Sequence, residues 1–329
     1  MMKTLQLRAF GKPATALDLI EAAPPAPAVG QVRVAVKAAP INPSDLLLIT
    51  GRYGVRPTLP AALGAEGVGR IVAVGPSVDP VRIGERVLIV PTLEHGAWQN
   101  QTVIDEGHAV PVDAKADALQ LAMLGINPLT ADLLLRRFTD LAPGAWVGQT
   151  GANSAVGRYV IALAQQAGLR TLNVVRRPEV VADLVALGAD AVVVSGPDLA
   201  AQITAALGHD QISLVLDAVG GDAVTGLAHS LVFGGTIVSY GGMSSGSPAV
   251  ISPAGLIFRD VRLRGFWLKH WLDATPRAQL AEHYGRLAAL VADGALRVPI
   301  EATYPLDQYR EALDRAARAG RAGKVLFTW

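Results

Sequence analysis

A run of small residues at 151–157 (GANSAVG) stands where a short apolar stretch gives way to an amphipathic one. A turn of small residues between a strand and a helix lets backbone N–H groups approach a pyrophosphate, and the helix N-terminus favours its negative charge. Asn153 and Ser154 would add side-chain donors at the same place. The run predicts a dinucleotide-binding turn. Because the three-glycine fingerprint is not intact, an ordinary strand–helix turn is the alternative.

Two arginines, Arg176 and Arg177, follow the next predicted strand, at 170–175. In this type of fold an acidic residue about 20 positions beyond the glycines binds the ribose 2′-hydroxyl of NAD. A carboxylate there would repel a 2′-phosphate, whereas a guanidinium group binds one with two hydrogen bonds. The pair therefore favours NADPH over NADH, with a solvated charged strand end as the alternative.

Other reaction types find little support in the residue types. The chain has no cysteine, which excludes disulfides, thiolate zinc sites, iron–sulfur clusters and a cysteine nucleophile. The six histidines form no pair at the i, i+4 spacing of helical metal ligands. A redox reaction with a bound dinucleotide is the chemistry that the sequence indicates.

The segment at 63–69 (LGAEGVG) resembles the G-H-E-x-x-G segment of medium-chain dehydrogenases/reductases. In the zinc alcohol dehydrogenases of that superfamily, this histidine and an upstream cysteine bind the catalytic zinc. Ala65 stands at the histidine position here, and cysteine is absent. We therefore expect no metal site, and alcohol oxidation with zinc as the Lewis acid is disfavoured.

Six further segments resemble the zinc-free 2-enoyl thioester reductases, which include the mitochondrial trans-2-enoyl-CoA reductases. They are residues 42–45, 51–54, 124–128, 173–176, 240–243 and 263–268. The resemblance implies an α/β fold, in which a GroES-like, β-rich catalytic domain is joined to a Rossmann domain with a doubly wound parallel sheet. It also implies NADPH-dependent reduction of the C2–C3 double bond of a trans-2-enoyl thioester, with hydride added at the β-carbon and a proton at the α-carbon.

The family's site residues are carried over by position. Tyr53 matches its proton-donating tyrosine, although a tyrosine in a loop is more often a packing residue. Arg177 joins the cofactor contacts through the charge argument alone, because the family segment there differs by an insertion. Glu66 is more often a buried carboxylate that holds a loop than a catalytic group. The positions that match cofactor contacts are Asn127, Asn153, Ser154, Ala155, Val156, Arg176, Tyr240, Gly241, Gly242, Met243, Phe266, Trp267, Leu268 and Lys324.

Two kinds of scaffold are needed to position these residues. Before about residue 120, strand-like runs at 32–38, 67–74 and 86–90 alternate with Gly, Pro and Asn, which is typical of a β-rich domain. Beyond it, short apolar runs alternate with helical stretches, which predicts a parallel sheet covered on both faces. The predicted elements include strands at 170–175, 191–194 and 236–240 and a helix at 199–207. We expect a catalytic domain of residues 1–120 with 294–329, and a Rossmann domain of residues 121–293.

Composition and charge set the remaining expectations. Of the 329 residues, 51% are hydrophobic and 17% are charged, which allows large buried cores. A net charge of +1 gives no support for a nucleic-acid partner. No run approaches the roughly 18 apolar residues of a membrane span. Residues 1–12 alternate apolar and polar side chains like a strand and do not resemble a signal peptide or a transit sequence, so we expect a cytoplasmic protein. We also expect a homodimer.

Two other functions fit the same residues. A quinone oxidoreductase of the same superfamily would share the fold and the NADPH site without needing Tyr53. A non-catalytic NADPH-binding protein would keep the cofactor fold without turnover, and the presence of Tyr53 argues against it. The expected substrate is an acyl thioester, carried by coenzyme A or by acyl-carrier protein.

Overall fold

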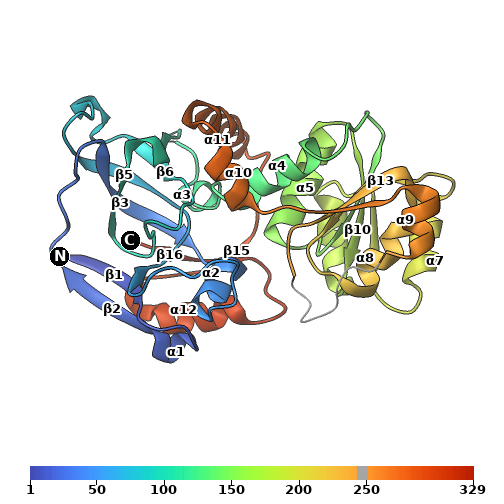
Figure 1. The fold of residues 1–329 in the computed structure, drawn as a ribbon, viewed down its shortest axis with the longest axis horizontal. Helices are drawn as coiled ribbons and strands as arrows, with labels where there is room; N and C mark the ends of the chain where they lie inside the picture. The colour runs from blue at the N-terminus through green and yellow to red at the C-terminus, as the bar shows by residue number, and fades with distance from the viewer. Residues whose placement is uncertain (114, 243–250) are drawn as a thin grey trace. The chain divides into compact units, whose positions relative to one another are not determined.

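The computed structural model describes every residue except 114 and 243–250 (Figure 1). The chain forms two compact units. The first contains Met1–Leu129 and Lys269–Trp329, and the second contains Thr130–Leu268.

The first unit is rich in strands. They are β1 (Met2–Leu7), β2 (Leu17–Ala22), β3 (Gln31–Pro40), β4 (Ala61–Ala62), β5 (Gly67–Val74), β6 (Arg86–Ile89), β7 (Gln101–Asp105), β8 (Ala109–Pro111), β15 (Ile300–Tyr304) and β16 (Lys324–Thr328). Among the described residues, one sheet has the order β15-β16-β3-β5-β6-β8 with β7 also paired to β3, and the other has the order β2-β1-β4. Because β16 pairs with β3 in an antiparallel register, the C-terminal strand completes the sheet of the N-terminal residues.

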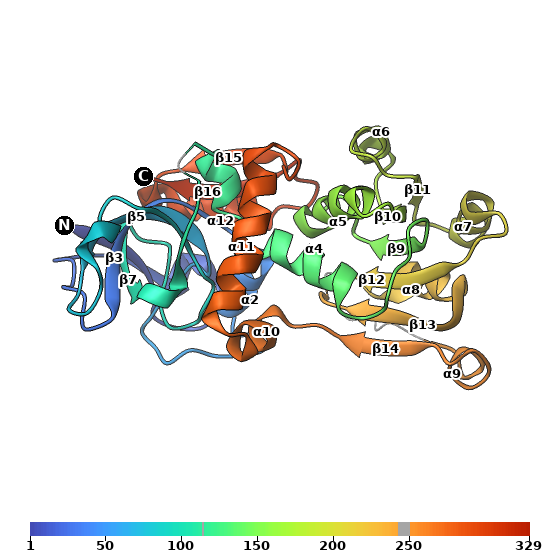
Figure 2. The same ribbon diagram turned by 90° about the horizontal axis from the view of Figure 1, so that it is seen from above.

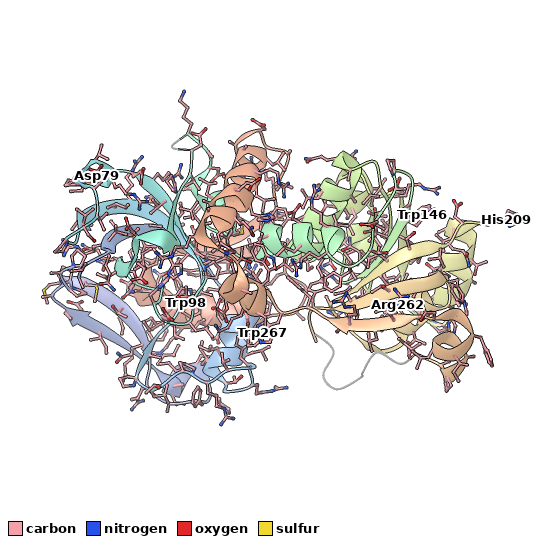
Figure 3. All side chains as sticks on the ribbon, turned by 45° about the horizontal axis from the view of Figure 1, so that its top comes forward. Asp79, Trp98, Trp146, His209, Arg262 and Trp267 are labelled. Carbon is pink, nitrogen blue, oxygen red and sulfur yellow. The ribbon has the colours of Figure 1, made fainter. Side chains whose placement is uncertain are left out.

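The first unit also contains helices. They are α1 (Pro13–Ala16), α2 (Pro43–Ile49), α3 (Ala118–Leu121), α11 (Arg277–Ala292) and α12 (Tyr309–Ala317). Helix α2 begins where it does because Asn42 and Asp45 form a capping box and Pro43 takes the first helical position. The core includes the indole ring of Trp98 (Figure 3), which packs edge-on against Phe327 of β16 with ring centroids 5.3 Å apart.

The second unit is a parallel sheet with helices on both faces. Its strands are β9 (Trp146–Thr150), β10 (Arg170–Val175), β11 (Ala191–Val194), β12 (Ile212–Asp217), β13 (Leu231–Ser239) and β14 (Arg262–Gly265), and its helices are α5 (Ala155–Gln166), α6 (Val181–Ala186), α7 (Leu199–Leu207), α8 (Gly221–Ala228) and α9 (Pro253–Arg259). The strand order is β11-β10-β9-β12-β13-β14 (Figure 2). This order, with its reversal between β9 and β12, is that of a Rossmann fold.

Two apolar cores flank the parallel sheet. One includes Ile161 of α5 and Leu184 of α6, and the other includes Ile203 of α7 and Leu227 of α8. The sheet is therefore covered on both faces, as short apolar runs between helices predict. With the β-rich first unit, this confirms the expected fold class.

The limits of the units differ from the expected domain boundaries at 120/121 and 293/294. Helix α11 packs against β8 and α3, so residues 277–292 belong with the first unit. Helices α4 (Asn127–Arg136) and α10 (Leu268–Ala274) contain the residues at which the chain passes from one unit to the other. The sequence did not predict this, because the amphipathic pattern of a helix does not indicate which sheet the helix packs against.

Candidate active site

The turn between β9 and α5 has the form that a pyrophosphate needs. Gly151 has a φ of +62°, which favours glycine. A Cβ on Gly157 would lie 2.5 Å from the carbonyl oxygen of Ala152, so only glycine allows the helix to approach the strand this closely. Ser154 caps α5, and its hydroxyl accepts a hydrogen bond from the Gly157 N–H (3.1 Å). The predicted contacts Asn153, Ser154, Ala155 and Val156 are the half-buried residues of this turn and of the first helical turn.

The turn after β12 faces it across the reversal in strand order. The Asp217 carboxylate accepts hydrogen bonds from the Thr150 hydroxyl (2.7 Å) and from the N–H groups of Val219 (3.0 Å) and Gly220 (2.9 Å). The same threonine hydroxyl accepts from the Ala218 N–H (2.9 Å). This buried network fixes the ends of β9 and β12 at the switch point, where dinucleotides bind in this fold. Sequence reasoning did not single out Asp217.

Two buried side-chain amides, those of Gln149 and Asn173, stabilise the turn between β9 and α5. Gln149 of β9 donates to the Asn173 side-chain oxygen (2.7 Å) and to the Gly157 carbonyl (3.0 Å). Asn173 of β10 donates in turn to the Ala191 carbonyl at the start of β11 (3.0 Å). These bonds tie three strands to the first turn of α5.

Arg176 and Arg177 directly follow β10, where a ribose-binding residue stands in this fold. Arg176 is exposed, and Arg177 is half-buried with its guanidinium group 3.5 Å from the Glu179 carboxylate. The position therefore carries cationic side chains next to the last strand residue, which suits a 2′-phosphate. Both remain predicted cofactor contacts.

The predicted contacts after β13 and β14 lie at the same edge of the sheet. The Tyr240 N–H donates to the Asp217 carbonyl (2.9 Å), and the Phe266 N–H donates to the Ser239 carbonyl (2.9 Å). A Cβ on Gly241 would lie 3.0 Å from the Ala218 carbonyl oxygen, so the backbone runs close to the switch point there.

Two side chains at this edge of the sheet, those of Tyr240 and Phe266, are held by their surroundings. Burial, and then the Asp217 charge, raises the pKa of Tyr240, whose buried hydroxyl has no hydrogen-bond partner among the described residues. The Phe266 ring packs edge-on against Phe138, with centroids 6.0 Å apart. Gly242 follows Gly241, Trp267 and Leu268 follow Phe266, and Met243 lies outside the described residues.

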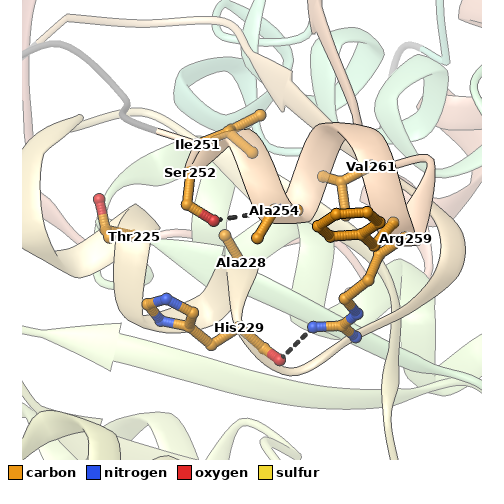
Figure 4. A pocket seen from close by; sticks show the side chains of 10 residues that line it. Thr225, Ala228, His229, Ile251, Ser252, Ala254, Arg259 and Val261 are labelled. Atoms are coloured by element: carbon orange, nitrogen blue, oxygen red, sulfur yellow. Dashed lines mark hydrogen bonds between the residues drawn. The ribbon is translucent and has the colours of Figure 1, made fainter.

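A separate pocket of the second unit lies between α8 and α9 (Figure 4). Its lining includes Thr225, Ile251 and Phe258. The Arg259 guanidinium group donates to the His229 carbonyl (2.8 Å) at one side of the pocket. The described residues that line it include none of the predicted site residues, so the pocket is distinct from the candidate cofactor site.

Tyr53 lies in the first unit, in the loop that follows α2. The N–H groups of Arg52 and Tyr53 both donate to the Leu47 carbonyl (2.9 and 3.2 Å). Gly51 makes the bend, with a φ of +70°. The half-buried Tyr53 side chain packs against the apolar core, so helix α2 and the core together hold this loop.

The other two predicted contacts of the first unit, Asn127 and Lys324, meet in a buried polar cluster. The Lys324 ammonium donates to the Asn42 side-chain oxygen, and the Asn127 amide donates to the same oxygen (3.2 Å). The Asn42 amide donates to the Glu66 carboxylate (2.8 Å). The second Glu66 oxygen accepts from the Ile126 N–H (2.8 Å), directly before α4. Glu66 therefore holds backbone, as the more common role predicts.

Burial governs the titration of this cluster. It raises the pKa of Asp45 to about 6, against the backbone hydrogen bond from Asn42 and the charge of Lys324. It also raises the pKa of Glu66 and lowers that of Lys324, although the two charges attract. Burial and the Glu66 charge raise the pKa of Tyr284, whose hydroxyl donates to the Gly125 carbonyl (2.9 Å). Sequence reasoning could not find this cluster, because its members are far apart in the chain.

Ala65 lies beside Glu66, at the position of the zinc-binding histidine in the zinc enzymes. Among the described residues, no three His, Asp or Glu side chains gather as a set of metal ligands. Within the same part of the chain, no helix combines the length and the apolar character needed to cross a bilayer.

Comparisons with known proteins found two family models that match this chain. The family "Alcohol dehydrogenase GroES-like domain" matches residues 28–114, and "Zinc-binding dehydrogenase" matches residues 187–326. The human protein named mitochondrial enoyl-[acyl-carrier-protein] reductase is 39% identical over 97% of this chain and 86% of its own length. The chain belongs to the 2-enoyl thioester reductase family of the medium-chain dehydrogenases/reductases.

Solved structures of related proteins cover the whole chain. The Etr1p complex with NADP and crotonyl-CoA has a TM-score of 0.84 and 27% identity, over 100% of this chain and 99% of its own. Quinone oxidoreductase from Pseudomonas syringae has a TM-score of 0.88 and 28% identity, over 100% of both chains. Both branches considered from the sequence are thus structural neighbours of this family member.

The expected cytoplasmic location is wrong by this comparison. The related enoyl reductases from human, rat, Arabidopsis and Dictyostelium are all named mitochondrial. The expectation rested on the alternating pattern of the first residues, which β1 explains. An alternating pattern predicts a strand, but it gives no information on cellular location, because targeting signals are recognised by receptors and do not determine the fold.

Proposed function

We propose that this chain catalyses the NADPH-dependent reduction of the C2–C3 double bond of trans-2-enoyl thioesters to acyl thioesters. One observation carries the proposal. A Rossmann unit with two arginines after its second strand occurs in the same chain as a Tyr53 loop that matches the family's proton donor. The first feature fits NADPH, and the second fits protonation of an enolate at its α-carbon.

The residues at the carboxyl edge of the parallel sheet suit the cofactor. Bound NADPH supplies the hydride for the β-carbon of the substrate. The half-buried turn at Asn153 and Ser154 and the N-terminus of α5 would hold its pyrophosphate. Arg176 and Arg177 would hold its 2′-phosphate. Gly241 lies close to the end of β12 and has no side chain, so the cofactor could approach the backbone there.

Tyr53 would serve the other half of the reaction. Hydride addition at the β-carbon places negative charge on the thioester oxygen, as an enolate. The Tyr53 hydroxyl would donate a hydrogen bond to this oxygen and supply the proton that the α-carbon takes up. Preorganised donors of this kind are worth about 3–4 kcal/mol in the transition state. The two hydrogen bonds to Leu47 and the packing of the ring would keep Tyr53 in place before substrate arrives.

The acyl carrier is coenzyme A or acyl-carrier protein. Two exposed arginines, Arg52 and Arg56, lie on either side of Tyr53 in the sequence. Their guanidinium groups would bind the phosphates of a carrier, whichever of the two is used. Comparing crotonyl-CoA with crotonyl-acyl-carrier protein as substrates decides between the carriers.

Quinone reduction is the second candidate function, because a quinone oxidoreductase is a structural neighbour with a TM-score of 0.88. A spectrophotometric assay that follows NADPH consumption with crotonyl-CoA and with a panel of quinones separates the two. We expect turnover with crotonyl-CoA to exceed turnover with every quinone. Turnover with quinones alone would identify the other branch.

A homodimer joined at β14 would extend the parallel sheet. In the described part of the chain β14 is an edge strand, and all four of its residues are exposed (Arg262 is labelled in Figure 3). On the neighbouring elements, Phe233, Ile257 and Phe258 are 74%, 71% and 75% exposed. A sheet edge beside apolar side chains favours pairing with a second copy. Light scattering should give twice the 34.3 kDa of one chain, and a monomeric mass would contradict this proposal.

A further inference from the structure

The buried polar cluster of the first unit has a defined direction of hydrogen bonding. The side chains of Asn42, Glu66, Asn127 and Lys324 are at most 7% exposed. Each buried donor and acceptor in such a cluster needs a partner, since an unmade bond costs more than a made one gains. The chemistry of the two charged ends therefore determines which way the amides between them point.

The Asn42 amide is fixed from both sides. A lysine ammonium group has donors only, so the Asn42 atom that it contacts is the oxygen. An ionised carboxylate has acceptors only, so the Asn42 atom that contacts Glu66 is the nitrogen (2.8 Å). Glu66 cannot turn to relieve this contact, because its other oxygen accepts from the Ile126 N–H (2.8 Å). Lys324 and Glu66 thus impose the same orientation independently.

The orientation of Asn42 then sets that of Asn127. The Asn42 oxygen accepts a second hydrogen bond, from the Asn127 nitrogen (3.2 Å). With its nitrogen committed to Asn42, Asn127 has its oxygen left to accept a bond from another molecule. An amide held in this way selects a ligand that donates.

We propose that Glu66, Asn42 and Lys324 are positioning residues that hold the Asn127 amide as an acceptor for an N–H or O–H donor of NADPH. This inference rests on the cofactor of the proposed function. The carboxamide and the ribose hydroxyl groups of NADPH are donors of this class. A further buried residue, Asp45, belongs to the α2 capping box, and its carboxylate keeps the Asn42 backbone in place by accepting from the Asn42 N–H (2.8 Å).

Exchanging the amide and the carboxylate tests the direction of bonding. In Glu66→Gln, the new amide must oppose a donor either at Ile126 or at Asn42, so one bond is lost. In the double variant Asn42→Asp with Glu66→Gln, the new amide accepts from Ile126 and donates to the new carboxylate, which still accepts from Lys324 and Asn127. Every bond of the cluster and its total charge are then retained. The exposed Glu21→Gln is the matched control.

NADPH dissociation constants from fluorescence titration provide the readout, with melting temperatures of the cofactor-free variants beside them. We expect Glu66→Gln to weaken binding on the order of 10-fold, as for one lost hydrogen bond, and the double variant to return to within about threefold of wild type. If the double variant binds no better than Glu66→Gln, the proposed direction is wrong. If Glu66→Gln fails to fold, folding of the double variant supports the proposal, and its failure contradicts it.

A second comparison shows whether Glu66 acts through Asn127. In an Asn127→Ala background, Glu66→Gln should change the NADPH dissociation constant by less than about twofold, because the group being positioned is gone. An undiminished effect would mean that Glu66 supports the site by another route, and would overturn the proposal. Both comparisons measure binding, so a chain that binds NADPH as expected but reduces no enoyl thioester would refute the proposed function alone.

Discussion

Replacing Lys324 by methionine removes a cation that faces two buried carboxylates. Lys324 is 7% exposed, Asp45 is 5% exposed, and Glu66 is fully buried. Methionine has a similar length and no charge, so the change takes the compensating charge of Lys324 away from both carboxylates. Lys324 attracts both carboxylates while its ammonium group bonds to Asn42. Breaking a buried ion pair in contact costs about 3–5 kcal/mol, so we expect a cost near the lower end of this range, about 3 kcal/mol. That corresponds to a fall in melting temperature on the order of 10 °C for a unit of this size.

The sign of the pH dependence follows from the raised carboxyl pKa values. Burial places the pKa of Asp45 at about 6, above its unfolded value of 3.8, and raises that of Glu66 as well. The charge of Lys324 opposes both shifts, so the variant should raise them further. Because the folded state then binds protons more tightly than the unfolded state, stability is gained as pH falls through these values and lost as pH rises. The deficit of Lys324→Met should be largest between about pH 7 and 8, where the carboxyls are ionised and Lys324 is still charged. It should shrink below about pH 6 as the carboxyls take up protons, and above about pH 8 as Lys324, whose pKa burial lowers to about 8, loses its own charge.

Urea unfolding followed by tryptophan fluorescence measures this effect, since Trp98 is fully buried in the same unit as Lys324. The exposed Lys12→Met is the control for loss of a positive charge. Equal stability of the two variants between about pH 7 and 8, or a deficit that grows below about pH 6, would refute the charge argument.

Three further predictions concern the cofactor site and metal content. Replacing Arg176 and Arg177 by alanine should weaken NADPH binding about 10- to 150-fold and NADH binding far less, and wild-type preference for NADH in titrations would contradict the role of the pair. Gly157→Ala places a Cβ 2.5 Å from the Ala152 carbonyl oxygen, so calorimetry should show weaker NADPH binding, whereas Gly285→Ala, with open space around it, should bind normally. With Ala65 at the zinc-binding position and no cysteine, elemental analysis should find no stoichiometric zinc, and one tightly bound zinc per chain would refute this expectation.

Local patterns predicted the scaffold of the cofactor site well. The strands at Arg170–Val175 and Ala191–Val194 and the helix at Leu199–Leu207 have the predicted bounds, because short apolar runs between helices leave little choice in a covered parallel sheet. Strand β13 begins at Leu231, earlier than the expected strand at 236–240. Gly234 has a φ of +72° within this strand. Glycine permits this conformation, but a glycine in the sequence does not indicate that a strand continues through it.

The polar groups that support the site were harder to predict. Glu66 and Lys324 are brought together because β5 and β16 both pair with β3, and no local pattern contains these pairings. Asp217 and Gln149 are buried polar residues in strands, and their value lies in partners contributed by other strands. A single sequence indicates which segments become strands, but not which buried donor meets which acceptor.

The central claim is that Tyr53 supplies the hydrogen bond and proton for enoyl thioester reduction. Tyr53→Phe removes the hydroxyl and keeps the ring that packs on the core, so folding and NADPH affinity should change little. The decisive measurement is the ratio of variant to wild-type kcat/KM with crotonyl-CoA, beside the same ratio for any quinone that is reduced. We predict a loss of about 10²- to 10⁴-fold with crotonyl-CoA, in kcat and kcat/KM together, and a much smaller loss with a quinone. Near wild-type reduction of crotonyl-CoA by Tyr53→Phe would contradict the assignment of Tyr53 to the chemistry.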